Sequence, residues 1–236
     1  MFDRILELKD YLHRLGVPSP EIAIMPFRGV DFHVGLLEDK REWKVDSIAA
    51  FPEFTFFTGR INSISVWLIP DLNLPQPAED VFLLRVAVAF GAGKFVLLNN
   101  SVSLKNASPS LMVVNDQIHL SGLNPLSGKN IDELGPRFPD MSMPFNASMI
   151  DQAVKVLQQS NIDFSQGVYA EVKKEDMNDI SKQQYFSFIG ADRIGESMAR
   201  QVIAIRHMQK PVLAFSADHY TNEFYTHLKG ILASMH

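Results

Sequence analysis

The sequence predicts a three-layer α/β/α fold in a single domain that spans residues 1–236. Two observations lead to this class. Short apolar runs that suit buried strands alternate along the chain with longer segments of helical periodicity. The 236 residues, 46% hydrophobic and 21% charged, suffice for one large domain, and no repeat, low-complexity tract or linker interrupts the alternation.

The first third of the chain is expected to form a helix and three strands. Residues 2–15 carry apolar side chains at near-helical spacing, which predicts an amphipathic helix. Residues 22–25 are apolar and lie between two prolines, which favours a buried strand. The β-branched and aromatic residues at 54–58 and 64–69 predict a pair of strands.

The alternation continues after a proline-rich segment. Pro70, Pro75 and Pro77 fit neither a helix interior nor a central strand, so residues 70–77 are expected to form a loop. Periodicity and composition then predict helices over 79–91, 148–159, 179–189, 198–208 and 222–235, and strands over 94–98, 167–172 and 211–215.

Composition excludes several classes of function. The net charge of −5 gives no support for a nucleic-acid partner. The absence of cysteine rules out disulfides and thiolate chemistry, and the histidines lack the spacing of a metal site. The apolar run 81–98 is interrupted by charged residues and glycines, so no membrane segment is expected. The N-terminal residues do not read as a signal or transit peptide, which favours a cytoplasmic location.

Two groups of motifs resemble those of the trimeric purine nucleoside phosphorylases. Residues 124–130 read NPLSGKN and residues 135–142 read GPRFPDMS. Residues 167–172, GVYAEV, lead without a gap to GAD at 190–192 and GES at 195–197. The resemblance implies a mixed β-sheet of the phosphorylase/hydrolase-like type, a homo-oligomer, usually a trimer, and a nucleoside or other small molecule as ligand. Phosphate would be the co-substrate of an active enzyme, and no other cofactor is implied.

At the positions where that family binds phosphate, this sequence carries other residues. Arg28 occupies a serine position of the first loop, where its guanidinium could bind phosphate or simply lie at the surface. Asp71 and Asn73 fall where the family has an arginine and a histidine. A carboxylate repels an anion, so Asp71 argues against phosphorolysis. Ser197 matches a family phosphate contact.

The positions that contact the nucleoside also differ. Asn178 and Tyr220 stand at the positions of the glutamate and asparagine that read the purine, with other donors and acceptors. Asn100 and Ser101 begin a loop that keeps the family's asparagine but loses both glycines. By resemblance, Tyr169 of the GVYAEV motif is a further ligand-binding residue.

Two carboxylates are candidates for new roles. Glu196 replaces a methionine beneath the ribose and could accept hydrogen bonds from ribose hydroxyls, or could pair with Arg193 or Arg200. Asp218 lies one residue later than the general acid of related nucleosidases, and could instead be a turn residue that accepts backbone N–H groups.

These substitutions leave two hypotheses. In the first, the chain is a pseudoenzyme, degenerate at the phosphate and purine sites, that binds or regulates without ordinary phosphorolysis. In the alternative, it is an active phosphorylase or nucleosidase of altered specificity that cleaves the N-glycosidic bond of a purine nucleoside. Water as the nucleophile would remove the need for a phosphate site. Base release with and without phosphate distinguishes the two.

Overall fold

The computed structural model describes residues 1–27, 29–48, 50–72, 74–106 and 108–235. Within these ranges it forms a ten-stranded sheet of order β2-β3-β4-β1-β5-β10-β7-β8-β9-β6. The strands are β1 (Ile22–Pro26), β2 (Glu38–Val45), β3 (Phe54–Ile61), β4 (Ile64–Leu68), β5 (Lys94–Asn100), β6 (Val102–Ser103), β7 (Leu111–His119), β8 (Phe164–Glu171), β9 (Arg193–Gly195) and β10 (Val212–Ala217). The sheet is mixed, as expected: β4, β1, β5 and β10 pair in parallel, whereas β7 runs antiparallel to β10.

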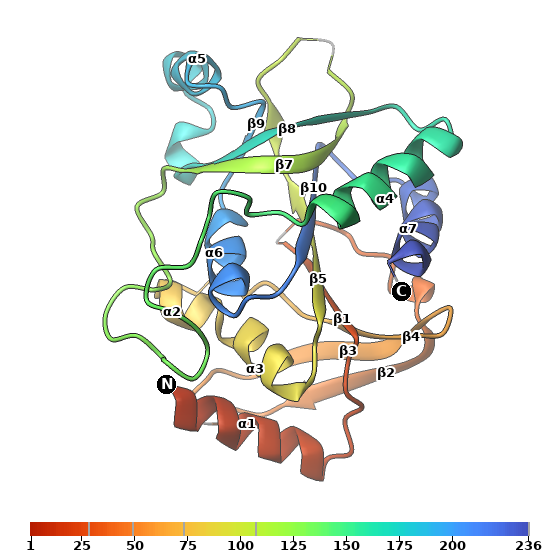
Figure 1. The fold of residues 1–236 in the computed structure, drawn as a ribbon, viewed down its shortest axis with the longest axis vertical. Helices are drawn as coiled ribbons and strands as arrows, with labels where there is room; N and C mark the ends of the chain where they lie inside the picture. The colour runs from red at the N-terminus through yellow and green to blue at the C-terminus, as the bar shows by residue number, and fades with distance from the viewer. Residues whose placement is uncertain (28, 49, 73, 107, 236) are drawn as a thin grey trace.

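Helices cover both sides of the central strands, which confirms the three-layer α/β/α fold. Figure 1 shows α4 and α7 on one side of β5 and β10, and α3 and α6 on the other. Helix α1 packs on α3. The helices are α1 (Phe2–Arg14), α2 (Pro77–Asp80), α3 (Phe82–Phe90), α4 (Ala147–Gln159), α5 (Ile180–Phe188), α6 (Ala199–His207) and α7 (Asn222–Ser234), with 3-10 turns η1 (Val34–Leu36) and η2 (Lys174–Asp176).

The core lies around the parallel strands at the centre of the sheet. The side chains of residues 22–25, 95–98 and 212–217 are buried. A strand covered by helices on both faces has no solvent-facing side, so it reads as a continuous apolar run. For this reason the runs at 22–25, 94–98 and 211–215 predicted strands correctly.

Several parts of the fold differ from the sequence prediction, and the two short strands β6 and β9 were also not predicted. Strand β2 was not predicted because its residues, EDKREWKV, are mostly charged and exposed, as suits the edge of a sheet. Strand β7 was missed because it is buried only in its first half. The helix expected over 79–91 is broken at Val81 into α2 and α3, and α2 begins at Pro77, where a missing N–H is tolerated.

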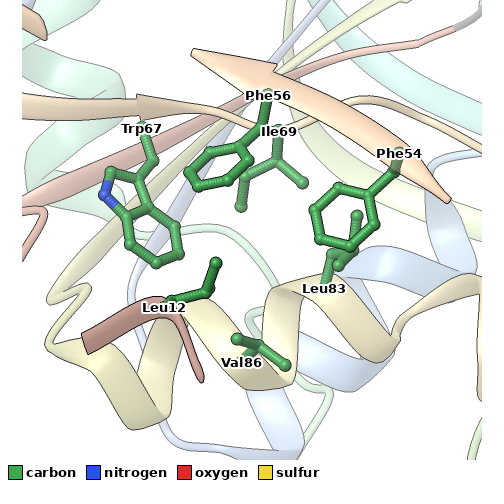
Figure 2. A pocket seen from close by; sticks show the side chains of 7 residues that line it. All are labelled: Leu12, Phe54, Phe56, Trp67, Ile69, Leu83 and Val86. Carbon is green, nitrogen blue, oxygen red and sulfur yellow. The ribbon is translucent and has the colours of Figure 1, made fainter. Parts of the chain in front are cut away.

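An apolar crevice lies between α1, α3 and the strands β3 and β4 (Figure 2). Its free space is about 10 Å³, and its lining side chains are all hydrophobic: Leu12, Phe54, Phe56, Trp67, Ile69, Leu83 and Val86. The indole N–H of Trp67 donates to the Pro18 carbonyl, 2.7 Å away, and so leaves no donor for a ligand. A space of this size holds at most one water, so the crevice is a packing defect of the core.

Within the described ranges, no helix has both the length and the apolar character needed to cross a bilayer.

Candidate functional site

A polar cavity of about 280 Å³ opens where several strands end. Its lining residues follow β1, β4, β8 and β9 or form the end of β5; they are Gly29, Asp71, Asn99, Asn100, Lys174, Met177, Glu196 and Ser197. Loops after strand ends are the usual ligand sites of α/β sheets. The structure therefore brings three predicted site residues, Asn100, Glu196 and Ser197, to one cavity together with Asp71.

The wall of the cavity at Ser197 is held in place from beneath. The hydroxyl of Tyr169, which is fully buried on β8, donates to the Ser197 carbonyl at 2.5 Å. The amide of Asn99 donates to the same carbonyl at 3.2 Å. Burial raises the pKa of Tyr169 well above its usual value, so the phenol stays a neutral donor. Tyr169 thus supports the cavity wall through Ser197.

Two glycines of the motifs that resemble the family are required because neighbouring atoms lie where a Cβ would be. A Cβ on Gly195 would lie 2.3 Å from the Tyr169 hydroxyl and 2.9 Å from Asn99 Oδ1. A Cβ on Gly167 would lie 2.2 Å from Asp192 Oδ2, which accepts a hydrogen bond from the Val168 N–H at 2.7 Å. Gly195 therefore shapes the cavity wall at Ser197, whereas Gly167 makes room for the Asp192 side chain beside β8.

The described residues that line the cavity carry more acidic than basic side chains. They include two carboxylates, Asp71 and Glu196, and one lysine, Lys174, a formal sum of −1. Lys174 Nζ lies 3.7 Å from Glu196 Oε1, and both side chains are substantially exposed. The ion pair of Glu196 with Arg193 or Arg200 is not formed; Arg200 instead donates to the Glu196 carbonyl at 3.3 Å. The Glu196 carboxylate therefore lines the cavity.

A buried charge network lies behind the cavity and ties its walls together. Arg200 Nη1 lies 3.2 Å from Asp80 Oδ2, and its Nε lies 2.9 Å from Glu171 Oε1 as an ion pair outside hydrogen-bond geometry. Asp80 also accepts hydrogen bonds from the Leu74 N–H and from Gln201. Burial, only partly offset by Arg200, raises the pKa of Asp80 to about 6. The network joins the 70–77 loop to β8 and α6.

Asp218 and Ser101 lie in a different cluster, organised by Arg193. The Arg193 guanidinium is buried, forms an ion pair with Asp218, and donates from Nε to Ser101 Oγ at 2.8 Å. The Ser101 hydroxyl also lies 2.6 Å from that of Ser216. Neither Asp218 nor Ser101 lines the cavity. From the sequence, Arg193 was expected only as a possible partner of Glu196; its place directly after the GAD motif was the available signal for its role in this cluster.

Tyr220 faces the protein backbone. Its hydroxyl lies 2.9 Å from the Phe215 carbonyl, 3.1 Å from the Asn99 carbonyl, and accepts a hydrogen bond from the Asn99 N–H at 2.9 Å. Burial raises the pKa of this phenol well above its usual range. Tyr220 thus joins the ends of β5 and β10, and its purine-reading role remains a prediction without a cavity contact.

Of the other predicted residues, Asn178 is exposed in the turn before α5 and does not line the cavity, although its neighbour Met177 does. Arg28 and Asn73 lie outside the described residues. Lys174, Met177, Gly29 and Asn99 were missed as lining residues. Lys174 and Met177 follow the strand at 167–172, and Gly29 and Asn99 lie beside the candidates Arg28 and Asn100 in the sequence. These positions could have indicated that they line the site.

Among the described residues, no group of three or more His, Asp or Glu side chains is placed to hold a metal ion.

The fold agrees with comparisons to known proteins. A family profile described as "Phosphorylase superfamily" matches residues 21–224, so the chain belongs to this superfamily. Purine nucleoside phosphorylase 1 of Bacillus subtilis is 27% identical over 229 residues, covering 92% of this chain and 84% of that protein. Purine nucleoside phosphorylase of Anopheles gambiae is 31% identical over 233 residues, covering 91% of this chain and 66% of that protein.

Solved structures show the same fold. The purine nucleoside phosphorylase from Schistosoma mansoni in complex with acetate superposes with a TM-score of 0.88 over 98% of this chain and 95% of that chain, at 19% identity. These findings confirm the resemblance to the purine nucleoside phosphorylases and the corresponding fold. The family match and the relatives together support a function of the purine nucleoside phosphorylase type.

Proposed function

We propose that this chain binds a purine nucleoside, or a ligand of similar chemistry, in the cavity lined by Asp71 and Glu196, and that it does so without ordinary phosphorolysis. The observation that carries this proposal is the charge of the described lining residues, a formal −1 from two carboxylates and one lysine. Two unit charges 4 Å apart interact by about 4 kcal/mol at an effective dielectric constant of 20. Such a lining disfavours a phosphate dianion and favours a neutral ligand that brings hydrogen-bond donors.

Further contacts support a neutral, donor-rich ligand. The Oδ1 atoms of Asn99 and Asn100 are enclosed and accept no hydrogen bond from the described residues, while their amide N–H groups donate to backbone carbonyls. Buried polar atoms normally have partners. Ribose hydroxyls and purine amino groups supply such donors, and the thioether of Met177 offers an apolar contact for a ring. Related structures of the same fold are described with adenosine and with hypoxanthine.

Calorimetric titration with a panel of purine nucleosides tests this proposal. We expect saturable binding that Glu196→Gln weakens about tenfold, as for the loss of a hydrogen bond to a charged group. Glu53→Gln is the matched control, because Glu53 is exposed and does not line the cavity. Failure of every nucleoside to bind would end the proposal. Phosphate-dependent base release at a rate on the order of 10 per second would instead disprove the loss of phosphorolysis.

A second candidate is hydrolysis of the nucleoside by water. It is favoured by the carboxylate of Glu196 at the cavity, since a carboxylate can act as a general base toward water. This candidate predicts base release without phosphate, abolished by Glu196→Gln. The earlier candidate for the general acid, Asp218, would have to act from outside the lining residues; wild-type base release in Asp218→Asn would exclude it.

The oligomeric state and the location are also proposals. We infer a homo-oligomer, a trimer by family resemblance, supported by the exposed apolar side chains of Phe138, Met143, Ile180 and Phe188. Sedimentation equilibrium measures the assembly, and a monomer at all protein concentrations would contradict it. A cytoplasmic location remains a prediction from the sequence.

A further inference from the structure

A second cavity, with no lining residue in common with the first, lies where α3, the end of α6 and the loop after residue 124 meet. Its volume is about 130 Å³, roughly ten times the space that one water needs. The lining residues are Met1, Ala78, Arg85, Pro125, Leu126, Ser127, Lys129, Asn130, Ile131 and His207. This lining contains two basic side chains and a histidine but no carboxylate.

Arg85 is the central feature of this cavity, because its charge is buried without a counter-ion. The side chain is 3% exposed, and no described carboxylate lies within ion-pair distance of it. Its Nη1 and Nη2 atoms donate to the carbonyls of Ala78 and Pro125, each 3.2 Å away, and its Nε has no hydrogen-bond partner. Burial lowers the pKa of Arg85 to about 10. A buried charge paired only with neutral groups is destabilising unless an anion compensates it.

Two acidic groups next in sequence to lining residues are already engaged. Glu79 interacts with Arg85 only at longer range, and its two carboxylate oxygens accept hydrogen bonds from Arg4 at 2.7 and 3.0 Å. Asp132 accepts a hydrogen bond from the Asn130 amide at 2.8 Å and does not line the cavity. The positive charge of Arg85 therefore stays largely uncompensated on the cavity side.

Two further residues at the cavity bear on its charge, an exposed lysine and a buried histidine. Lys129 is exposed and forms no ion pair with the described residues. His207 is 1% exposed, and its Nε2 lies 3.1 Å from Asn130 Oδ1. The Gly135 carbonyl lies close enough to the His207 imidazole to favour its protonated form. The Nδ1 atom of His207 nevertheless has no hydrogen-bond partner among the described residues. Burial, then the charge of Arg85, lowers the pKa of His207.

We propose that this cavity binds a small oxyanion, inorganic phosphate or a carboxylate, as the counter-ion of Arg85, with Lys129 and Ser127 at its mouth. An arginine is suited to such anions because its guanidinium presents several fixed N–H donors. The site is independent of the nucleoside cavity and of any reaction there.

Binding is tested on the full chain by following the His207 ring resonances in NMR titrations with phosphate and, separately, with acetate. Ionic strength is held constant with chloride. We expect a saturable shift of the His207 signals with at least one anion, and a higher pKa of His207 in its presence. The responding anion, phosphate, acetate or both, identifies the class of oxyanion.

Lys129→Gln locates the site without disturbing the carbonyl contacts of Arg85, whose own removal could unfold the loop. The variant should weaken anion binding at least about threefold, as expected for loss of one exposed charge partner. Lys155→Gln on α4, an exposed lysine that lines neither cavity, should leave it unchanged. The proposal is overturned if neither anion gives a saturable His207 shift, or if Lys129→Gln binds the anion as tightly as wild type.

Discussion

Single side chains decide the shape of the candidate site through the groups that hold them. Gly195 leaves room for the Tyr169 hydroxyl and for Asn99, and both of these donate to the Ser197 carbonyl. The cavity wall therefore depends on a residue with no side chain and on a tyrosine that does not line the cavity. Glu196 forms no ion pair with the two arginines near it in sequence, because Arg193 pairs with Asp218 and Arg200 with Asp80. Its carboxylate lies at the cavity beside the exposed Lys174.

Gly195→Ala should displace this wall. The added Cβ would lie 2.3 Å from the Tyr169 hydroxyl, so we expect a loss of about 1–3 kcal/mol of unfolding free energy together with weaker nucleoside binding. Chemical denaturation and calorimetry measure the two effects. Gly230→Ala is the control: its Cβ would meet only Val156 Cγ1 at 3.6 Å inside α7, and alanine there should stabilise by up to about 1 kcal/mol. Unchanged stability and binding in Gly195→Ala would contradict this account.

Neighbouring helices and strands are coupled by the Asp80–Arg200–Glu171 network. Asp80 closes α2, Arg200 and Gln201 belong to the first turn of α6, and Glu171 ends β8. His119 of β7 extends the network through Ser121, which lies 2.8 Å from His119 Nε2 and donates to Glu171 at 2.7 Å. Burial lowers the pKa of His119 despite the charge of Glu171. Burial is the main reason that Asp80 gains a proton readily in this network, and Arg200 offsets it only in part.

The network predicts a stability that falls as pH rises. The pKa of Asp80 is about 6 in the folded state against 3.8 for the ordinary group, so the folded protein binds the proton more tightly. The contribution of Asp80 protonation to the free energy of unfolding is fully present below pH 3.8 and is lost as pH rises through about 6. It amounts to at most about 3 kcal/mol.

Asp80→Asn removes this proton linkage. We expect the unfolding free energy of wild type relative to Asp80→Asn to decline between pH 4 and pH 6 and to level off above it. Urea denaturation across this range measures it, with Asp163→Asn as a control at a side chain that no network residue contacts. A constant difference between wild type and Asp80→Asn across the pH range would show that Asp80 does not titrate there.

The whole molecule is organised around one continuous sheet. The central strands contribute to a single large cluster of buried residues, and a smaller cluster containing Ala170, Phe186 and Ile194 lies beside β8 and β9. Since the sheet passes through both clusters, the interpretation as one domain over residues 1–236 implies cooperative unfolding.

Two spectroscopic probes test this cooperativity. Trp43 and Trp67 lie on β2 and β4, so their fluorescence reports one edge of the sheet, whereas far-UV circular dichroism reports all helices. We expect the two signals to change at the same urea concentration. Separate midpoints would show that the region around β8 and β9 unfolds as an independent unit.

Local patterns in the sequence were sufficient for the fold class, most of the helices and the central strands, because a strand buried on both faces must be apolar throughout and a surface helix must be amphipathic. The motifs at 124–142 and 167–197 indicated the family for a similar reason, since glycines such as Gly195 are required by contacts that few other residues permit. Asp71 and Glu196 became candidates through the family resemblance, and the structure places both at one cavity. Only the tertiary structure decided which polar groups meet: Tyr220 with the backbone of β5, Asp218 with Arg193, and Arg85 without a counter-ion. Such pairings join residues far apart in the chain, and their energies depend on distance and burial, which no local pattern records.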